Sequence, residues 1–279
     1  MSRIRSLAAA LWLLAMPLAV SQADARSIGV QPLLVDVAPG QNAAIRVRNS
    51  SDTPTTVDVT IAKRLIDQAG VQTRQEADDD FVVFPPQATV APGSSQVFRV
   101  QAIDTKMAES QSYFLTVQQV PVEFKPVERP EGQGGAQLQV LFAFDVAVHV
   151  VPRGAKAEME FVSSAPAETK ITLPNPATNL ADANAPLPPP IVKTVPGVSV
   201  TVRNTGNKYL YLQEYDFIVS GTDASGAKVD LPAPTVREVI DAAGVTLVPP
   251  GGTREFKLPL PEGSNLKDIA VRVRDRPRG

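Results

Sequence analysis

The sequence has no cysteine and a single histidine, His149. The absence of cysteine excludes disulfides, thiol catalysis and zinc–thiolate sites, and one histidine excludes any site built from several histidines. Neither a G-x-S-x-G motif nor a P-loop is present, so hydrolase and nucleotide chemistry have no support. An enzyme based on carboxylates is the one catalytic class left open, and the spacing indicates no pair. We therefore expect no enzyme, no metal and no cofactor.

The chain also has little net charge and few long apolar runs. The 27 basic and 29 acidic residues nearly cancel, which gives no reason to expect nucleic acid or an anionic membrane as a partner. One apolar stretch stands out, Leu7 to Val20, which follows Arg3 and Arg5 and precedes the small-x-small run 23–25. We predict a signal peptide over residues 1–25 that exports the protein, and no membrane anchor in the mature chain.

Alternating apolar and polar residues dominate the rest of the chain, and helical periodicity is almost absent. The length of the mature chain suits two domains of ordinary size. In the first half we predict strands at 28–37, 44–48, 55–62, 81–84, 96–102, 113–120 and 138–151. In the second half we predict strands at 157–162, 198–203, 209–219, 228–231, 245–248, 254–258 and 269–274. Short strands at this spacing are typical of immunoglobulin-like sandwiches.

Two motifs occur twice, which indicates a repeated topology. The run PGQNAAIRVRNS at 39–50 is echoed by PGVSVTVRNT at 196–205, and APGSSQVFRV at 91–100 is echoed by PGGTREFKL at 250–258. We therefore predict domains at 26–153 and 154–279. The alternative is that Pro-Gly turns precede alternating strands in many β-proteins. The proline-rich stretch from Leu173 to Pro196 predicts a long loop.

The run LQVLFAFDVAVHVVP, from Leu138 to Pro152, has Leu, Val or Phe at every even position from 138 to 150. Fifteen extended residues reach about 50 Å, which is more than one sandwich needs. Natural proteins suppress unpaired apolar edges, so we predict that another chain completes part of this strand. The alternative is a central strand that is buried on both faces.

Four landmarks in order resemble the periplasmic chaperones of the chaperone-usher pilus pathway, as a divergent member. They are VDVAPGQNAAIRVRN (35–49), FPP with PG and FRV (84–100), SYFLTVQQVP (112–121) and the run 138–152. The resemblance implies an all-β fold of two immunoglobulin-like β-sandwich domains in a boomerang arrangement. It also implies an ATP-independent chaperone of the periplasm that binds pilus subunits and delivers them to an outer-membrane usher.

The resemblance also implies a binding site. Family members donate the last strand of the first domain to a subunit that lacks its own last strand. Here the donor strand is about 138–144, and the side chains that match the groove-filling positions are Leu138, Val140, Phe142 and Phe144. The competing interpretation is that these side chains fill the protein's own core, which is what we expect for Val146, Val148 and Val150.

The chain departs from the family pattern where members use an arginine and a lysine to hold the subunit's terminal carboxylate. These positions are Leu34 and Ala147, and neither side chain can bind a carboxylate. Candidate substitutes are Arg153, Arg99 and His149, each of which can also be an ordinary solvated or packed residue. A second function stays open, an exported structural or adhesive protein that self-associates through the same strand. A free chaperone could likewise cap itself as an oligomer.

Overall fold

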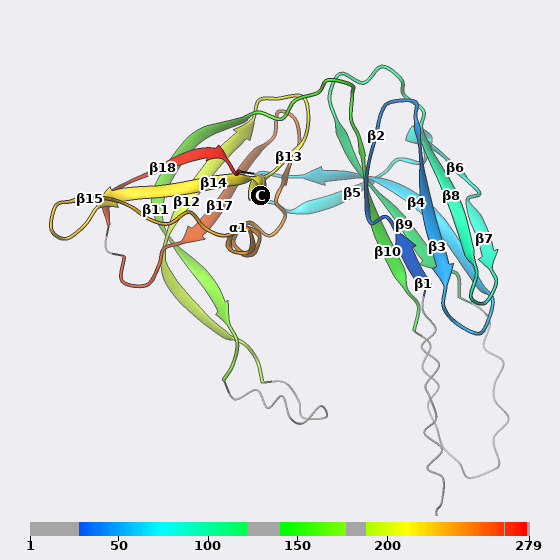
Figure 1. The fold of residues 1–279 in the computed structure, drawn as a ribbon, viewed down its shortest axis with the longest axis horizontal. Coiled ribbons are helices and arrows are strands. Elements are labelled where there is room, and N and C mark those ends of the chain that lie inside the picture. The colour runs from blue at the N-terminus through cyan, green and yellow to red at the C-terminus, as the bar shows by residue number, and fades with distance from the viewer. Residues whose placement is uncertain (1–27, 122–139, 177–187, 265, 278–279) are drawn as a thin grey trace, which may run out of the picture.

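The computed structural model describes residues 28–121, 140–176, 188–264 and 266–277. Figure 1 shows two β-domains set at an angle, the boomerang of two immunoglobulin-like sandwiches that the resemblance implied. The predicted signal peptide and Leu138 lie outside the described residues. In the described part of the chain, no helix combines the length and apolar character needed to cross a bilayer.

The first domain packs two sheets face to face. The sheet that we call the β3 sheet has the order β1 (Ile28–Gln31), β3 (Asn42–Asn49), β8 (Ser95–Ala102) and β6 (Phe81–Phe84). The sheet that we call the β9 sheet has the order β2 (Leu34–Val37), β10 (Ala143–Val150), β9 (Gln111–Gln119), β4 (Thr55–Ile66) and β5 (Gln72–Glu76), and β7 (Gln87–Val90) also pairs with β4. A 3-10 turn, η1 (Asp78–Asp80), precedes β6. Alternate residues of both sheets, such as Ile45, Phe98 and Leu115, are fully buried between them.

The N-terminal segment divides between the two sheets, although a single strand over 28–37 was the prediction. β1 pairs antiparallel with β3, whereas β2 pairs parallel with the last half of β10. Pro32 lies between them and has no backbone N–H to donate to a ladder, so the first pairing ends at Gln31. The switch leaves β2 beside residues 147–150 of β10 and not beside its first residues.

In its described residues, the second domain contains three small sheets and one helix. The sheets are β11 (Met159–Leu173), β12 (Ile191–Asn204) and β17 (Thr253–Pro259); β13 (Leu210–Tyr211) and β16 (Leu247–Val248); and β15 (Lys228–Asp230), β14 (Tyr215–Thr222) and β18 (Lys267–Asp275). A 3-10 turn, η2 (Leu212–Glu214), lies between β13 and β14, and the helix α1 is Val236–Ala243. Fully buried Val200 and Phe217 are part of the second core.

Three predictions for the second domain were wrong, and one of them is the single strand over 209–219, which η2 interrupts. Helix α1 was missed, although Thr235 and Glu238 form a capping box and Gly244 ends the helix. The predicted loop 173–196 is also too long, because residues 191–196 belong to β12 and pair with 168–173 of β11. This pairing forms a two-stranded hairpin that projects from the sheet (Figure 1).

The repeated motifs correspond to one structural role used twice. Asn49 and Asn204 end equivalent strands and are both fully buried. Asn49 Nδ2 donates to Val90 O at 3.0 Å, and Asn204 Nδ2 donates to Val248 O at 3.1 Å. Each amide thereby satisfies buried backbone groups at a sandwich end. The sequence echo therefore reflects a shared topology and not only a common turn.

Candidate functional site

The first residues of β10 form an unpaired sheet edge. β9 pairs with all of β10, from Ala143 opposite Gln118 to Val150 opposite Gln111. On the other side, β2 reaches only residues 147–150. Among the described residues no strand lies beside 143–146 on that side. The start of β10 is therefore paired on one side only.

The hydrogen-bond pattern identifies the groups that face this open side. Ala147 N donates to Leu33 O at 2.9 Å on the β2 side, whereas Phe142 O accepts from Gln119 N at 3.0 Å on the β9 side. Backbone groups of a strand alternate between its two neighbours. Ala143 and Asp145 therefore direct their N–H and C=O groups to the open side, where an added strand could pair with them.

The side chains at this end are only partly covered. Val140 and Leu141 are 56% and 46% exposed, while Phe142 and Phe144 are half-buried against the first core. The two phenyl rings stack with centroids 6.4 Å apart. By contrast, the side chains farther along the strand that we expected in the core are buried, namely Val146, Val148 and Val150. The described part of the predicted strand 138–151 thus becomes β10 only from Ala143, and the apolar row runs from the core within β10 to solvent at Val140, which precedes the strand.

The outer face of the β9 sheet contacts the second domain through His149. The His149 side chain is 0% exposed. Its Nδ1 lies 2.8 Å from Ser112 Oγ, and its Nε2 lies 3.0 Å from the Tyr211 hydroxyl. Burial lowers the pKa of His149 to about 4. Both nitrogens are occupied and the ring is neutral at pH 7, so this geometry offers a carboxylate no contact.

The remaining candidate anchors, Arg99 and Arg153, lie on different elements and are not brought together. Leu34 lies opposite Ala147 and is 49% exposed, so this point of the sheet carries no charge. Arg99 is exposed on β8 of the β3 sheet, away from the β9 sheet. Arg153 is exposed in the turn after β10. The carboxylate site that the resemblance implied is therefore absent at its usual positions.

Comparison with known protein families gives a match over the first domain. Residues 28–156 match the family model described as the pili and flagellar-assembly chaperone, PapD N-terminal domain. The first domain belongs to this chaperone family. No curated protein sequence matches the chain significantly.

Solved structures are similar in fold to the chain as a whole. The class 5 fimbriae chaperone CfaA is similar at 13% identity and a TM-score of 0.50, and the match covers 90% of this chain and 100% of that one. A chain from the chaperone–tip adhesin complex of CFA/I fimbriae is similar at 12% identity and a TM-score of 0.50, with 88% and 98% covered. The likeness therefore extends over both domains.

Two arginines of the chaperone domain that the sequence did not single out meet on the outer face of the β9 sheet. Arg64 on β4 lies opposite Arg74 on β5. Their guanidinium carbons lie 4.9 and 4.6 Å from the centroid of the Phe114 ring. Arg74 also forms an ion pair with Asp145 on β10. The arginines therefore connect the hairpin of β4 and β5 to the strand with the open edge.

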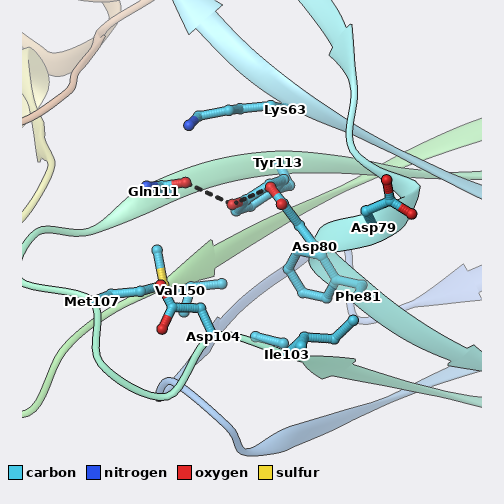
Figure 2. A pocket seen from close by; sticks show the side chains of 11 residues that line it. Lys63, Asp79, Asp80, Phe81, Ile103, Asp104, Met107, Gln111, Tyr113 and Val150 are labelled. Carbon is cyan, nitrogen blue, oxygen red and sulfur yellow. Dashed lines mark hydrogen bonds between the residues drawn. The ribbon is translucent and has the colours of Figure 1, made fainter.

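The chaperone domain also contains a cavity of about 300 Å³ at the opposite end of β10, beside Val150 (Figure 2). The Tyr113 hydroxyl lies 2.9 Å from Asp80 Oδ2 and 2.7 Å from Gln111 Oε1. Burial raises the pKa of Tyr113, and the hydrogen bond to Asp80 adds to this. Tyr113, Asp80 and Gln111 in the lining are thus bonded to one another, and the cavity is separate from the open edge.

Proposed function

We propose that the protein is a non-enzymatic, ATP-independent periplasmic chaperone that binds pilus subunits through the start of β10 and hands them to an outer-membrane usher. The observation that carries the proposal is the edge of Ala143 and Asp145, which no strand covers in the described part of the chain. The family match of residues 28–156 supports it. A subunit that lacks a strand offers the groups this edge needs.

The proposed contact combines backbone and side-chain terms. Each net backbone hydrogen bond contributes about 0.5–1.5 kcal/mol. Full burial of an exposed Val or Phe contributes about 1.5–3 kcal/mol, and the half-buried Phe142 and Phe144 gain only part of this. After the costs of association, the sum fits a complex that holds a subunit and still releases it by strand exchange.

Charge at neighbouring positions tests the proposal. Val140 is on the face of the groove-filling side chains, and Leu141 is on the opposite face with similar exposure. V140D should lower the yield of a co-expressed pilus subunit at least about tenfold, because an apolar groove does not accept an unpaired carboxylate. The matched control L141D should lower the yield much less. The measurement is the amount of subunit in periplasmic extracts.

Equal effects of V140D and L141D would contradict the groove-filling role of the even positions. An unchanged subunit yield in both variants would contradict the use of this strand altogether. The alternative of a self-associating structural protein is tested by gel filtration of the protein alone. A concentration-independent dimer that V140D dissociates would favour it, whereas the family match favours the chaperone.

A further inference from the structure

The outer face of the β3 sheet carries a positive charge that the balance of the whole chain conceals. Its four strands, β1, β3, β8 and β6, contain the exposed arginines Arg46, Arg48 and Arg99 and no acidic residue. Acidic side chains such as Asp52 and Asp79 lie in turns before or after these strands. The near equality of 27 basic and 29 acidic residues therefore does not describe this surface.

The three arginines lie close to one another. Arg46 and Arg48 are two residues apart on β3, so their Cα atoms are separated by about 7 Å. Arg46 lies opposite Val97 of β8, which places Arg99 at the diagonal position, about 7–8 Å away. None of the three forms an ion pair within the part of the chain that the structure describes. A ligand with several negative charges would relieve their mutual repulsion.

Exposed apolar side chains border these charges at one edge of the sheet. Phe84 of the edge strand β6 lies opposite Arg99 and is 70% exposed. Val82 is on the same face of β6 and is 55% exposed. Peripheral proteins bind anionic bilayers through this combination of cationic and apolar side chains. The fork of an arginine also matches the oxygens of a phosphate.

The outer face of the β3 sheet is accessible to a large partner. The two sheets of the first domain pack face to face, so this face points away from the β9 sheet and from the open edge of β10. Figure 1 shows β6 and β8 on the side of the first domain that is far from the second domain. A surface bound here would leave the first residues of β10 uncovered.

The distribution of side chains favours a bilayer over a folded protein. A specific protein interface concentrates aromatic and apolar residues at its centre and keeps most charges at its rim. Here the order is reversed, because Arg46 and Arg99 are on the central strands β3 and β8 whereas Phe84 is on the edge strand. A layer of headgroups requires no complementary shape, so it suits a flat charged sheet.

We propose that the outer face of the β3 sheet binds the surface of an anionic phospholipid bilayer. Arg46, Arg48 and Arg99 contact lipid phosphates, and Phe84 lies at the level of the headgroups. Each arginine near an anionic surface strengthens binding about fivefold, so the three together favour anionic over neutral lipid about a hundredfold. Where the proposed function also holds, this contact keeps the chaperone beside the membrane that contains the usher.

The first test is co-sedimentation of the purified protein with sucrose-loaded vesicles. One set contains equimolar phosphatidylglycerol and phosphatidylethanolamine, and the other contains phosphatidylcholine alone. We expect binding to the anionic vesicles to be about a hundredfold tighter at low salt. It should weaken strongly at high salt, because salt screens exposed charges. Equal binding to both sets, or binding to neither, would overturn the proposal.

The second test assigns the binding to this face. The variant R46Q/R48Q/R99Q should lose the preference for anionic vesicles, and R46Q alone should lose about fivefold. The control variant removes three exposed positive charges elsewhere, in R153Q/K170Q/R203Q, and should keep most of the preference. Thermal unfolding should be similar in all variants, because none of these arginines has an ion pair. Equal losses in the two triple variants would overturn the assignment to the β3 sheet.

The third test separates a bilayer from an acidic protein segment, with soluble polyglutamate as the second probe. F84A should weaken binding to anionic vesicles about threefold, because an apolar side chain leaves the headgroup layer. Binding of polyglutamate without binding of vesicles would overturn the bilayer as the partner. V140D should bind vesicles like the wild type, so loss of subunit binding and loss of bilayer binding are observed separately.

Discussion

At the scale of single residues, His149 couples the protonation of one ring to the contact between the domains. Its pKa is lowered from 6.5 to about 4 by burial. Above pH 6.5 the ring is neutral in both the folded and the unfolded chain. Between pH 6.5 and 4 only the unfolded chain takes up the proton, so stability falls as the pH falls through this window. We expect a loss of about 2 kcal/mol between pH 7.5 and 5 from this residue.

The variant H149Q isolates this contribution. Its side chain does not titrate, so the difference in unfolding free energy between wild type and variant should shrink by about 2 kcal/mol on going from pH 7.5 to 5. Urea unfolding at both pH values measures this, and the carboxylates that also titrate cancel in the comparison. A difference that is independent of pH would show that the pKa of His149 is the same in the folded and the unfolded chain, as expected for an exposed ring.

Some residue roles could be inferred from the sequence and others could not. The runs that contain Asn49 and Asn204 were identified as a repeated motif because they share a local spacing, and the structure gives the two asparagines the same role. Arg64 and Arg74 could not be identified, because β5 reads QTRQE without apolar alternation and gives no strand signal. Their meeting on Phe114 depends on a hairpin register that no local pattern encodes.

At the scale of elements, the open edge of β10 depends on backbone groups and is testable without changing an apolar side chain. Proline at position 143 removes an N–H that faces the open side while leaving the bonds to β9 in place. We expect A143P to fold with little loss of stability and to reduce subunit yield strongly in the co-expression assay. The control A143V keeps the N–H and should retain most of the yield. A143P that still protects the subunit would show that backbone pairing at this edge is not used.

The hairpin of β11 and β12 shows where element prediction failed. Prolines between 173 and 196 argued for a loop, yet Pro196 and Pro166 lie within paired strands. The pairing extends beyond the reach of β17, whose last residue, Pro259, lies opposite Gly197. A proline is tolerated there because one side of the strand needs no ladder bond. Proline content therefore excluded a central strand but not an edge hairpin.

At the scale of the whole molecule, the angle between the domains depends on how the hairpin tip of β4 and β5 docks on Arg254. Gly70 at this tip has a φ of +87°, and a Cβ there would collide with the Arg254 guanidinium. Arg254 has little freedom to move, because it is fully buried and its Nη2 also donates to Val245 O at 2.7 Å. Gly70 therefore permits the contact that fixes the second domain against the first.

We predict that G70A loosens this contact while both sandwiches stay folded. The matched control is G93A, where φ is +67° and no atom lies within 4 Å of the added Cβ. Both variants carry the strain of a left-handed alanine, about 1 kcal/mol. Any further loss of stability in G70A therefore reports the loss of the contact between the hairpin tip and Arg254. The Glu255 amide donates to Gln68 O, and its hydrogen exchange should accelerate at least about tenfold in G70A alone. If Glu255 exchanges equally slowly in both variants, the tip does not fix the domain angle, and the position of Arg64 must be set by the β9 sheet itself.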